Sequence, residues 1–174
     1  MTTYFFSDFQ KEAVAVCSDR CATLDYLYPG FIAKLGEILE IEAKIIRGDY
    51  DDLSKDEIEG MIDSKIGDIY WFMAMIAQVK DLDIDFEIEQ EKLDIDNNYS
   101  VMLTATSMLA VMATIYTAQN KPGGMICPAT NDLESLFMQL VGFTRTLVLG
   151  RISEKDVLDK NINKLADRQK KGWN

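Results

Sequence analysis

The chain has 174 residues, 48% hydrophobic and 27% charged, a composition typical of one globular domain with a substantial core. Its formal net charge at pH 7 is −11, since 29 acidic residues outnumber 18 lysines and arginines. A body this acidic repels nucleic-acid backbones, so no nucleic acid is expected as a partner. The chain has no histidine, which excludes histidine-based triads, histidine general bases and histidine-ligated zinc.

The N-terminal stretch and the cysteines predict a cytoplasmic protein. Residues 1–8 lack the basic region and the long apolar region of a signal peptide. Three cysteines are an odd count for a secreted disulfide scaffold. Cys17 and Cys21 are one helical turn apart, which is a suitable spacing for half a metal site. No second cysteine pair and no histidine completes that site, so buried reduced thiols are the simpler interpretation.

The first part of the chain is expected to form two helices. Ser7-Asp8-Phe9-Gln10 has the spacing of a capping box and predicts a helix that runs to about Tyr26. Pro29-Gly30 is expected to break this helix. Apolar residues at helical spacing then predict a second helix over residues 31–47, followed by a loop over residues 48–52.

A third helix and an acidic connector follow. Ser54-Lys55-Asp56-Glu57 is another capping box and predicts a helix to about Lys80 with a broad apolar face. In residues 81–98 apolar and acidic residues alternate, which is typical of an extended segment. No other run offers a partner for a real sheet, and a short helix over Glu87–Leu93 fits the pattern equally well.

The last part of the chain predicts three more helices, one of them uncharged. Residues 98–120 contain no charged side chain and are long enough to span a membrane. Their serines and threonines and the lack of a flanking basic cluster favour a helix buried on most sides in the bundle, with no membrane association. Lys121-Pro122-Gly123-Gly124 ends it, and further helices are predicted over residues 131–149 and 153–171. The predicted fold is an all-α bundle of about six helices.

A polar stripe on the second predicted helix is a candidate metal site. Glu37 and Glu40 lie three residues apart, so a helix places their carboxylates on one side. Lys44 and Arg47 continue the same face. Two carboxylates beside two cations could hold a divalent metal and the phosphates that the metal neutralises. The alternative is a solvated face with a Glu40–Lys44 ion pair worth about 0.3–0.5 kcal/mol.

Two other segments carry polar groups that suit a binding site. Asp68 lies in an otherwise apolar stretch, where a carboxylate is costly to bury unless it is paired or coordinated, and Gly67 beside it lets a backbone or a ligand come close. Asn161, Lys164 and Arg168 fall on one helical face and could bind phosphates. The simpler alternatives are a solvent-facing aspartate and a basic helix end that complements its own dipole.

Three motifs, taken in order, resemble the MazG-like family of all-α nucleoside triphosphate pyrophosphohydrolases: Gly36-Glu37-x-x-Glu40, Ile66-Gly67-Asp68-Ile69-x-Trp71-Phe72 and Asn161-x-x-Lys164-Leu165-x-x-Arg168-x-x-x-Gly172. The resemblance covers roughly residues 8–80 and 153–172 and treats residues 1–174 as a single domain. Residues 82–152 are longer than the same part of short family members and are expected to be an inserted helical pair. This pair completes the packing within one chain, forms a dimer interface or shapes the base pocket.

The resemblance implies a magnesium-dependent enzyme, with manganese as a possible substitute, that hydrolyses a (d)NTP to a (d)NMP and pyrophosphate. Glu37, Glu40 and Asp68 match three metal-binding positions, and Glu37 or Glu40 would act as the catalytic base. The fourth position is Lys65 here, which cannot be a metal ligand while protonated but can pair with a carboxylate or contact the triphosphate. This departure leaves a catalytically impaired nucleotide-binding or regulatory protein on the same fold as the alternative.

Further substrate contacts follow from the same resemblance. Lys44, Arg47, Lys164 and Arg168 would neutralise the triphosphate together with Asn161. Trp71 or Phe72 would stack on the base, although core packing is the favoured interpretation of Phe72. A homodimer or higher homo-oligomer is expected. A third hypothesis is a helical protein-interaction module that uses the uncharged residues 98–120.

Overall fold

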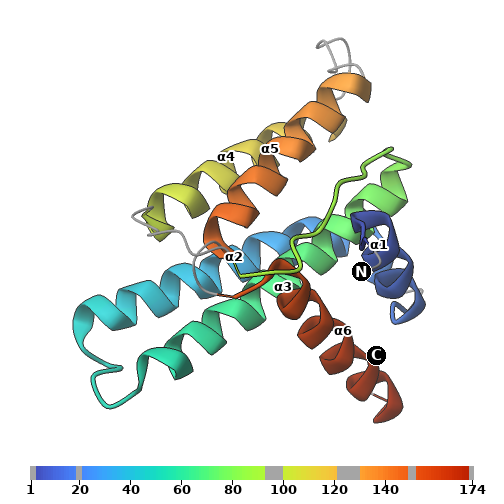
Figure 1. Ribbon diagram of the computed structural model, residues 1–174. Coiled ribbons are helices and arrows are strands. Elements are labelled where there is room, and N and C mark those ends of the chain that lie inside the picture. The colour runs from blue at the N-terminus through green and yellow to red at the C-terminus, as the bar shows by residue number, and fades with distance from the viewer. Residues whose placement is uncertain (1–2, 19–20, 93–99, 121–129, 149–151, 173–174) are drawn as a thin grey trace.

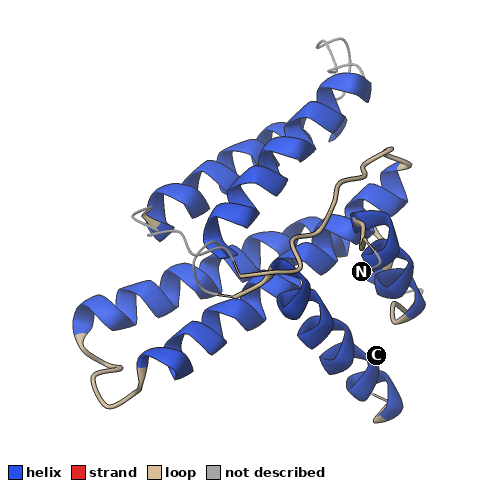
Figure 2. Ribbon diagram, in the orientation of Figure 1, coloured by secondary structure: helices blue, strands red, loops and turns tan. Residues whose placement is uncertain are grey.

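The computed structural model describes residues 3–18, 21–92, 100–120, 130–148 and 152–172, and over these ranges the chain forms six α-helices and no named strand (Figure 1, Figure 2). The helices are α1 (Phe6–Ala15), α2 (Leu24–Arg47), α3 (Lys55–Lys80), α4 (Val101–Asn120), α5 (Thr130–Val148) and α6 (Glu154–Lys170). The predicted all-α fold is therefore confirmed.

The helix α3 is the centre of the bundle and packs against α1, α2, α5 and α6. Every residue from Ile69 to Ala77 is buried, because neighbouring elements cover this stretch of α3 on all sides. The helices α2 and α3 form an antiparallel hairpin, and α4 and α5 form a second antiparallel pair beside it (Figure 1). The helix α6 crosses α3 and leaves the centre on the side away from α4 and α5 (Figure 1).

The predicted starts of two of these helices are confirmed. At the start of α3 the Glu57 amide donates to Ser54 Oγ at 3.3 Å, and the Ser54 amide donates to the Glu57 carboxylate at 2.8 Å. At the start of α6 the Asp156 amide donates to Ser153 Oγ at 3.0 Å. These bonds satisfy amides that the first helical turn leaves without partners, and both helices start where the sequence predicted.

The predicted boundary between the first two helices is wrong. The helix α1 ends at Ala15 and α2 already begins at Leu24, so Pro29-Gly30 lies inside α2 and does not break it. Pro29 lacks one backbone donor, but the residues around it in α2 are packed in the core, which offsets that loss. A Cβ on Gly30 would lie 2.3 Å from the Phe72 ring, so this glycine allows α2 to pack closely on α3.

The start of α1 also differs from its prediction. The N-cap is Phe5, whose amide donates to the Asp8 carboxylate at 3.2 Å, whereas the Ser7 amide donates to Asp85 at 3.1 Å. Asp85 belongs to the connector after α3, a contact between residues 78 positions apart. The first helical turn is therefore satisfied in part by a long-range contact, which local sequence spacing does not reveal.

The acidic connector after α3 is extended over residues 82–92, as its alternating pattern predicted. It lies beside the start of the chain, where the Phe6 amide donates to Phe86 O and the Ile88 amide to Tyr4 O, both at 2.9 Å. The alternative of a short helix over Glu87–Leu93 is wrong as far as residue 92, and Leu93 lies outside the described residues.

The uncharged helix α4 is less buried than predicted. It packs on α5 and α2 with one face only, while Met102 is 56% and Leu103 68% exposed. The prediction of a helix buried on most sides is therefore wrong, because no further element covers the outer face among the described residues. In the described part of the chain no helix is long and apolar enough to cross a membrane. The predicted end of this helix, residues 121–124, lies outside the described residues.

An ionic cluster around a buried carboxylate, made of Tyr70, Arg145 and Glu154 and called the buried cluster below, fixes α6 against α3 and α5. The Glu154 side chain is only 2% exposed and accepts hydrogen bonds from Tyr70 Oη and from Arg145 Nε, the latter at 3.2 Å. The Glu89 amide of the connector donates to the same carboxylate at 3.0 Å. Four elements therefore meet at one carboxylate, and this contact determines how α6 lies across α3.

Candidate functional site

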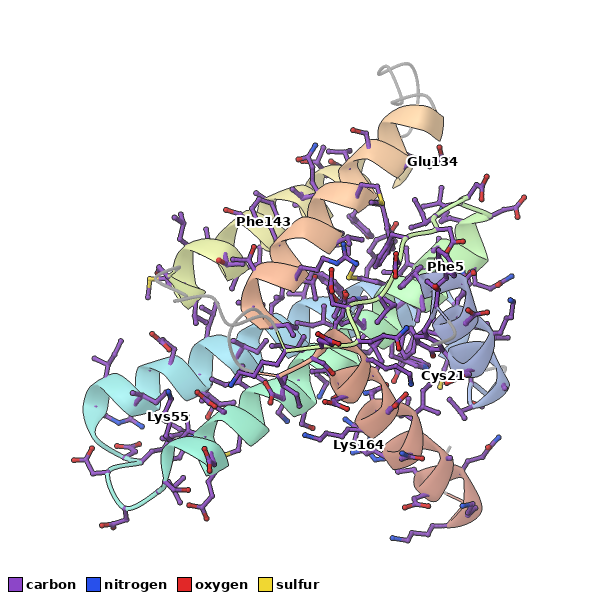
Figure 3. The ribbon with its side chains drawn as sticks, viewed as in Figure 1. Phe5, Cys21, Lys55, Glu134, Phe143 and Lys164 are labelled. Carbon is purple, nitrogen blue, oxygen red and sulfur yellow. The ribbon has the colours of Figure 1, made fainter. Side chains whose placement is uncertain are left out.

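A second ionic cluster lies where α2, α3 and α6 meet, and its charges alternate in sign. Along the row, the members are Lys65, Glu37, Lys34, Asp68 and Lys164. Glu37 binds Lys34 through one carboxylate oxygen and Lys65 through the other, both at 2.6 Å. Lys34 is also 3.7 Å from Asp68. Lys164, which lies on α6 (Figure 3), binds the other oxygen of Asp68. We call these five residues the lysine cluster.

The helix α6 contacts the lysine cluster through a close approach to α3. Asn161 is 2% exposed and its amide nitrogen donates to Asp68 Oδ1 at 2.8 Å. A Cβ on Gly67 would lie 2.9 Å from Asn161 Cβ and 3.2 Å from Val157 O, so only glycine gives α6 this room. The expectation that Gly67 lets another backbone come close is therefore confirmed.

Two predicted site residues on α2 lie apart from the lysine cluster. Glu40 is 61% exposed and pairs with Lys44 at 2.7 Å, as in the solvated alternative considered from the sequence. Arg47 donates to Asp49 at 2.8 Å and lines neither of the two cavities described below. Of the stripe proposed for α2, only Glu37 joins the residues of α3 and α6.

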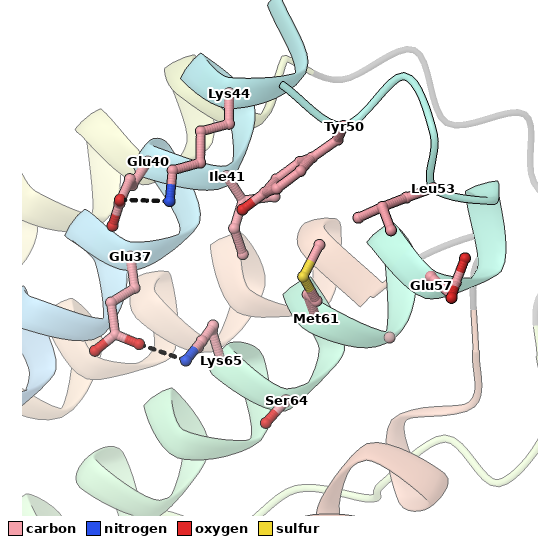
Figure 4. Close-up of a pocket in the computed structure, with 11 residues that line it drawn as sticks. Glu37, Glu40, Ile41, Lys44, Tyr50, Leu53, Glu57, Met61, Ser64 and Lys65 are labelled. Carbon is pink, nitrogen blue, oxygen red and sulfur yellow. Dashed lines mark ion pairs between the residues drawn. The ribbon is translucent and has the colours of Figure 1, made fainter. Parts of the chain in front are cut away.

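A large cavity adjoins the lysine cluster between α2 and α3. Its volume is about 790 Å³, and Figure 4 shows the Glu37–Lys65 and Glu40–Lys44 ion pairs along one side of it. The other side is apolar and is formed by Tyr50, Leu53 and Met61 (Figure 4).

A smaller cavity of about 240 Å³ lies on the other side of the lysine cluster, between the α1–α2 junction, α3 and α6. Its polar lining includes Lys34, Asp68 and Arg168. Its remaining wall is mostly aromatic and sulfur-containing and includes Cys17, Cys21, Tyr26, Trp71 and Phe72. A cavity that combines cations with aromatic rings suits an anion attached to a flat, apolar group.

The aromatic wall of the smaller cavity is held rigidly. Trp71 is 7% exposed and its indole nitrogen donates to Ala13 O at 3.3 Å. Phe72 is 5% exposed and its ring lies edge-on to Trp71 with 5.0 Å between the centroids. Core packing, the favoured interpretation of Phe72, is thus observed together with a place on the cavity wall.

The lysine cluster carries more positive than negative charge, since three ammonium groups share two carboxylates. Burial lowers the pKa of Lys164, Asp68 raises it, and the like charges of Arg168 and Lys34 lower it further, so the net shift is downward. The Arg168 side chain makes no hydrogen bond or ion pair with any residue that the structure describes. This local surplus of positive charge would be relieved by an anion.

Glu37 is held as a carboxylate by its two lysines. Burial acts to raise the pKa of Glu37, but the hydrogen bonds from Lys34 and Lys65 lower it more strongly, so the net pKa lies below the ordinary value. Both carboxylate oxygens already have ammonium partners. A carboxylate in this state is a weak general base, and each of its oxygens would have to share or release an ammonium partner before it could bind a metal.

The donor set does not fit the predicted magnesium site. Magnesium requires several oxygen ligands, whereas Glu37 and Asp68 are bound to ammonium groups and Glu40 pairs with Lys44. Over the described ranges there is no group of three or more acidic or cysteine side chains placed to hold a metal ion. Dependence on magnesium or manganese stays a prediction that this arrangement does not favour.

Lys34 is the member of the lysine cluster that was not predicted from the sequence. It lies three residues before Glu37, just as Lys65 lies three residues before Asp68. Two facing helices that each carry a lysine and then an acid at this spacing can pair reciprocally, and this repeated spacing was the available signal.

No family model, no curated protein and no solved structure matches this chain. The MazG-like resemblance therefore rests on the three motifs alone, and a function has to be inferred from the geometry of the lysine cluster.

Proposed function

We propose that this protein binds a nucleoside triphosphate, or a related nucleoside phosphate, at the lysine cluster without a metal ion and without hydrolysing it. The observation that carries the proposal is the position of Lys34, whose ammonium lies between the carboxylates of Glu37 and Asp68. Lys65 binds the other side of Glu37. These tethered cations provide the positive charge that a metal ion would otherwise bring to a phosphate chain.

The phosphates would bind toward the smaller cavity. The side chain of Arg168 lines that cavity and has no partner among the described residues, and its guanidinium can bind two phosphate oxygens at once. Lys34 lines the same cavity, and Lys164 lies close enough to Arg168 and Lys34 for their charges to interact. Asn161 holds Asp68 at 2.8 Å and so keeps this carboxylate from turning toward the anion.

The nucleobase would occupy the aromatic wall of the same cavity. Tyr26 and Trp71 line it, and Tyr26 is 45% exposed, which leaves its ring accessible to a ligand. Stacking on an aromatic side chain contributes about 1–3 kcal/mol per base and tolerates different bases. We therefore expect modest base selectivity.

Hydrolysis is the alternative that the motif resemblance predicts, and it makes different demands on the same residues. It needs a cation that polarises the reacting phosphate and a carboxylate able to take a proton from water. Glu37 is poorly suited to take that proton while Lys34 and Lys65 hold both of its oxygens. Binding without turnover is therefore the better supported of the two functions.

Calorimetric titration of a panel of dNTPs and NTPs in the presence of EDTA tests the proposal. Wild-type protein should bind, and Arg168→Ala should bind at least tenfold more weakly, since a hydrogen-bonded charge contributes about 1.5–3 kcal/mol. Arg47→Ala is the matched control, because Arg47 lies outside both cavities. Failure of every nucleotide to bind would overturn the proposal, and so would magnesium-dependent release of pyrophosphate that Glu37→Ala abolishes.

Thiol labelling gives a second, local readout. Cys17 and Cys21 place their thiols on the wall of the smaller cavity, and Cys127 lies outside the described residues. In a Cys127→Ala background, a bound nucleotide should slow the labelling of both thiols. Unchanged labelling rates at a saturating nucleotide concentration would place the ligand elsewhere.

A further inference from the structure

A nucleotide bound in the smaller cavity leaves the larger cavity unused. The larger cavity has a volume of about 790 Å³, within the range of small-molecule sites, and lies on the other side of the lysine cluster. The two cavities share this cluster as a common wall. Glu37 and Lys65 line the larger cavity. Lys34 and Asp68 line the smaller one. A ligand that occupies both cavities therefore has to pass along the lysine cluster.

The lysine cluster is accessible along its length. Its side chains are between 13% and 34% exposed, so a ligand can contact them while the helices stay packed. Glu37 binds Lys34 through one oxygen and Lys65 through the other, both at 2.6 Å. One carboxylate therefore separates an ammonium group beside the smaller cavity from an ammonium group beside the larger one. A chain of linked phosphates that lies along the cluster meets a cation at each end.

The charge of this shared wall suits several phosphates in a row. Together with Arg168, the lysine cluster has four cations and two carboxylates, a surplus of two positive charges. Each of the two carboxylates already contacts two ammonium groups. An ammonium group has three donors, so it can contact a phosphate oxygen while it keeps its carboxylate partners. A polyphosphate chain can therefore bind along the cluster without breaking its ion pairs.

The far side of the larger cavity suits a nucleoside. Tyr50, Leu53 and Met61 form an apolar surface there (Figure 4). Glu57 also lines the cavity and accepts from Ser54 through Oε2, while its Oε1 has no partner among the described residues. A carboxylate oxygen of this kind is a suitable acceptor for ribose hydroxyls, and an aromatic ring such as that of Tyr50 can stack on a base. The larger cavity thus offers contacts for both parts of a nucleoside.

We propose that the ligand of this protein is a dinucleoside polyphosphate, with one nucleoside in each cavity and the phosphate chain along the lysine cluster. This proposal rests on the binding of nucleoside phosphates at the lysine cluster and names the class to which the ligand belongs. Once the first nucleoside is bound, the phosphate chain holds the second one close to its own cavity. The second contact then adds affinity at a small cost in ordering.

Calorimetric titration of two tetraphosphates in the presence of EDTA tests the proposal. Diadenosine tetraphosphate and adenosine 5′-tetraphosphate have the same number of phosphates, and only the first has a second nucleoside. Wild-type protein should bind diadenosine tetraphosphate about tenfold or more tightly, because its second base stacks in the larger cavity. Equal affinities would overturn this proposal and leave the proposed function standing. Failure of both ligands and of every mononucleotide to bind would overturn the proposed function as well.

The length of the phosphate chain gives a second readout that needs no substitution. In a series from diadenosine diphosphate to diadenosine hexaphosphate, affinity should rise sharply at the length that spans the cluster and change little beyond it. The reason is that a shorter chain allows only one nucleoside to bind at a time. A steady increase with each added phosphate would indicate that charge alone determines affinity and would overturn the proposal.

Tyr50→Ala tests the position of the second nucleoside. This variant should lose the advantage of diadenosine tetraphosphate and should bind adenosine 5′-tetraphosphate as the wild type does, because Tyr50 lines only the larger of the two cavities. Tyr116→Ala is the matched control, since Tyr116 is 48% exposed on α4 and lines neither cavity, and it should keep the advantage. An undiminished advantage in Tyr50→Ala would overturn the placement of a nucleoside in the larger cavity.

Discussion

Two ionic clusters join α3 to α6, and they differ in burial and in charge balance. In the buried cluster, Glu154 is 2% exposed and accepts from Tyr70, Arg145 and a backbone amide, so its carboxylate is fully satisfied. In the lysine cluster the side chains are 13–34% exposed, cations outnumber carboxylates, and two cavities adjoin them. The first cluster has no group left for a ligand, whereas the second has a surplus of positive charge.

This difference separates a structural role from a binding role within one pair of helices. A buried charge with all its partners holds the fold, because removing one partner leaves the other uncompensated. A partly exposed cluster contributes less to stability, since solvent screens its pairs, and it can exchange internal partners for a ligand. Substitutions in the two clusters should therefore affect different measurements.

The largest effect is expected for Glu154→Ala. This change leaves Arg145 and Tyr70 without their carboxylate and should lower the free energy of unfolding by about 3–5 kcal/mol. Urea denaturation followed by circular dichroism measures it. Asp167→Ala removes an exposed pair with Lys170 and should cause no measurable change. A Glu154→Ala protein as stable as the wild type would remove the distinction between the clusters.

A smaller loss of stability is expected for Gly67→Ala. The added Cβ would press on Asn161 and on the Val157 carbonyl, which should cost about 1–3 kcal/mol as α6 moves away. Gly60→Ala, also in α3, has no neighbour within 4 Å of its added Cβ and should stabilise by about 0.5–1 kcal/mol. If the two substitutions change the free energy of unfolding in opposite directions, the result supports the close α3–α6 contact. Changes in the same direction would contradict it.

The pH dependence of nucleotide binding should report on Lys164. Burial, Arg168 and Lys34 keep the pKa of Lys164 below its ordinary 10.5, and a bound anion would raise it. Affinity should therefore be full at pH values below the pKa of the free protein and should fall as pH rises through it, before ordinary lysines titrate. Lys164→Arg should remove this decline, because arginine stays charged. Equal pH profiles for wild type and Lys164→Arg would exclude Lys164 from the phosphate site.

The smallest effect is expected for Glu37 in acid. Its pKa lies below 4.5 in the folded protein, since the hydrogen bonds from Lys34 and Lys65 outweigh the opposing effect of burial. The carboxylate thus contributes stability above its unfolded pKa, and this contribution is lost as pH falls through the lowered folded pKa. Solvent screening limits the contribution to about 0.2–1 kcal/mol. Urea titrations at neutral and acid pH should show wild type and Glu37→Gln converging in acid, and a constant difference would contradict the ion pairs.

Much of the fold followed from local sequence patterns. The capping box at Ser54 located the start of α3, the start of α6 at Ser153 was predicted correctly, and the alternating connector proved extended over its described residues. The boundary between α1 and α2 could not be predicted, because Pro29-Gly30 usually interrupts a helix. In this chain the packing of Gly30 against Phe72 keeps α2 continuous.

For the candidate site, too, one part could be predicted from the sequence and another could not. The sequence by itself determined which side chains share a helical face, because the period of the α-helix is constant, and so it grouped Asn161, Lys164 and Arg168. Only the tertiary structure decided which faces meet. Lys34 and Lys65 pair with Glu37, whereas Glu40 pairs with Lys44 and takes no part in the lysine cluster. Which charged residues pair between two helices depends on how the helices cross. A lysine near a carboxylate has the same sequence pattern whether it faces solvent or a neighbouring helix.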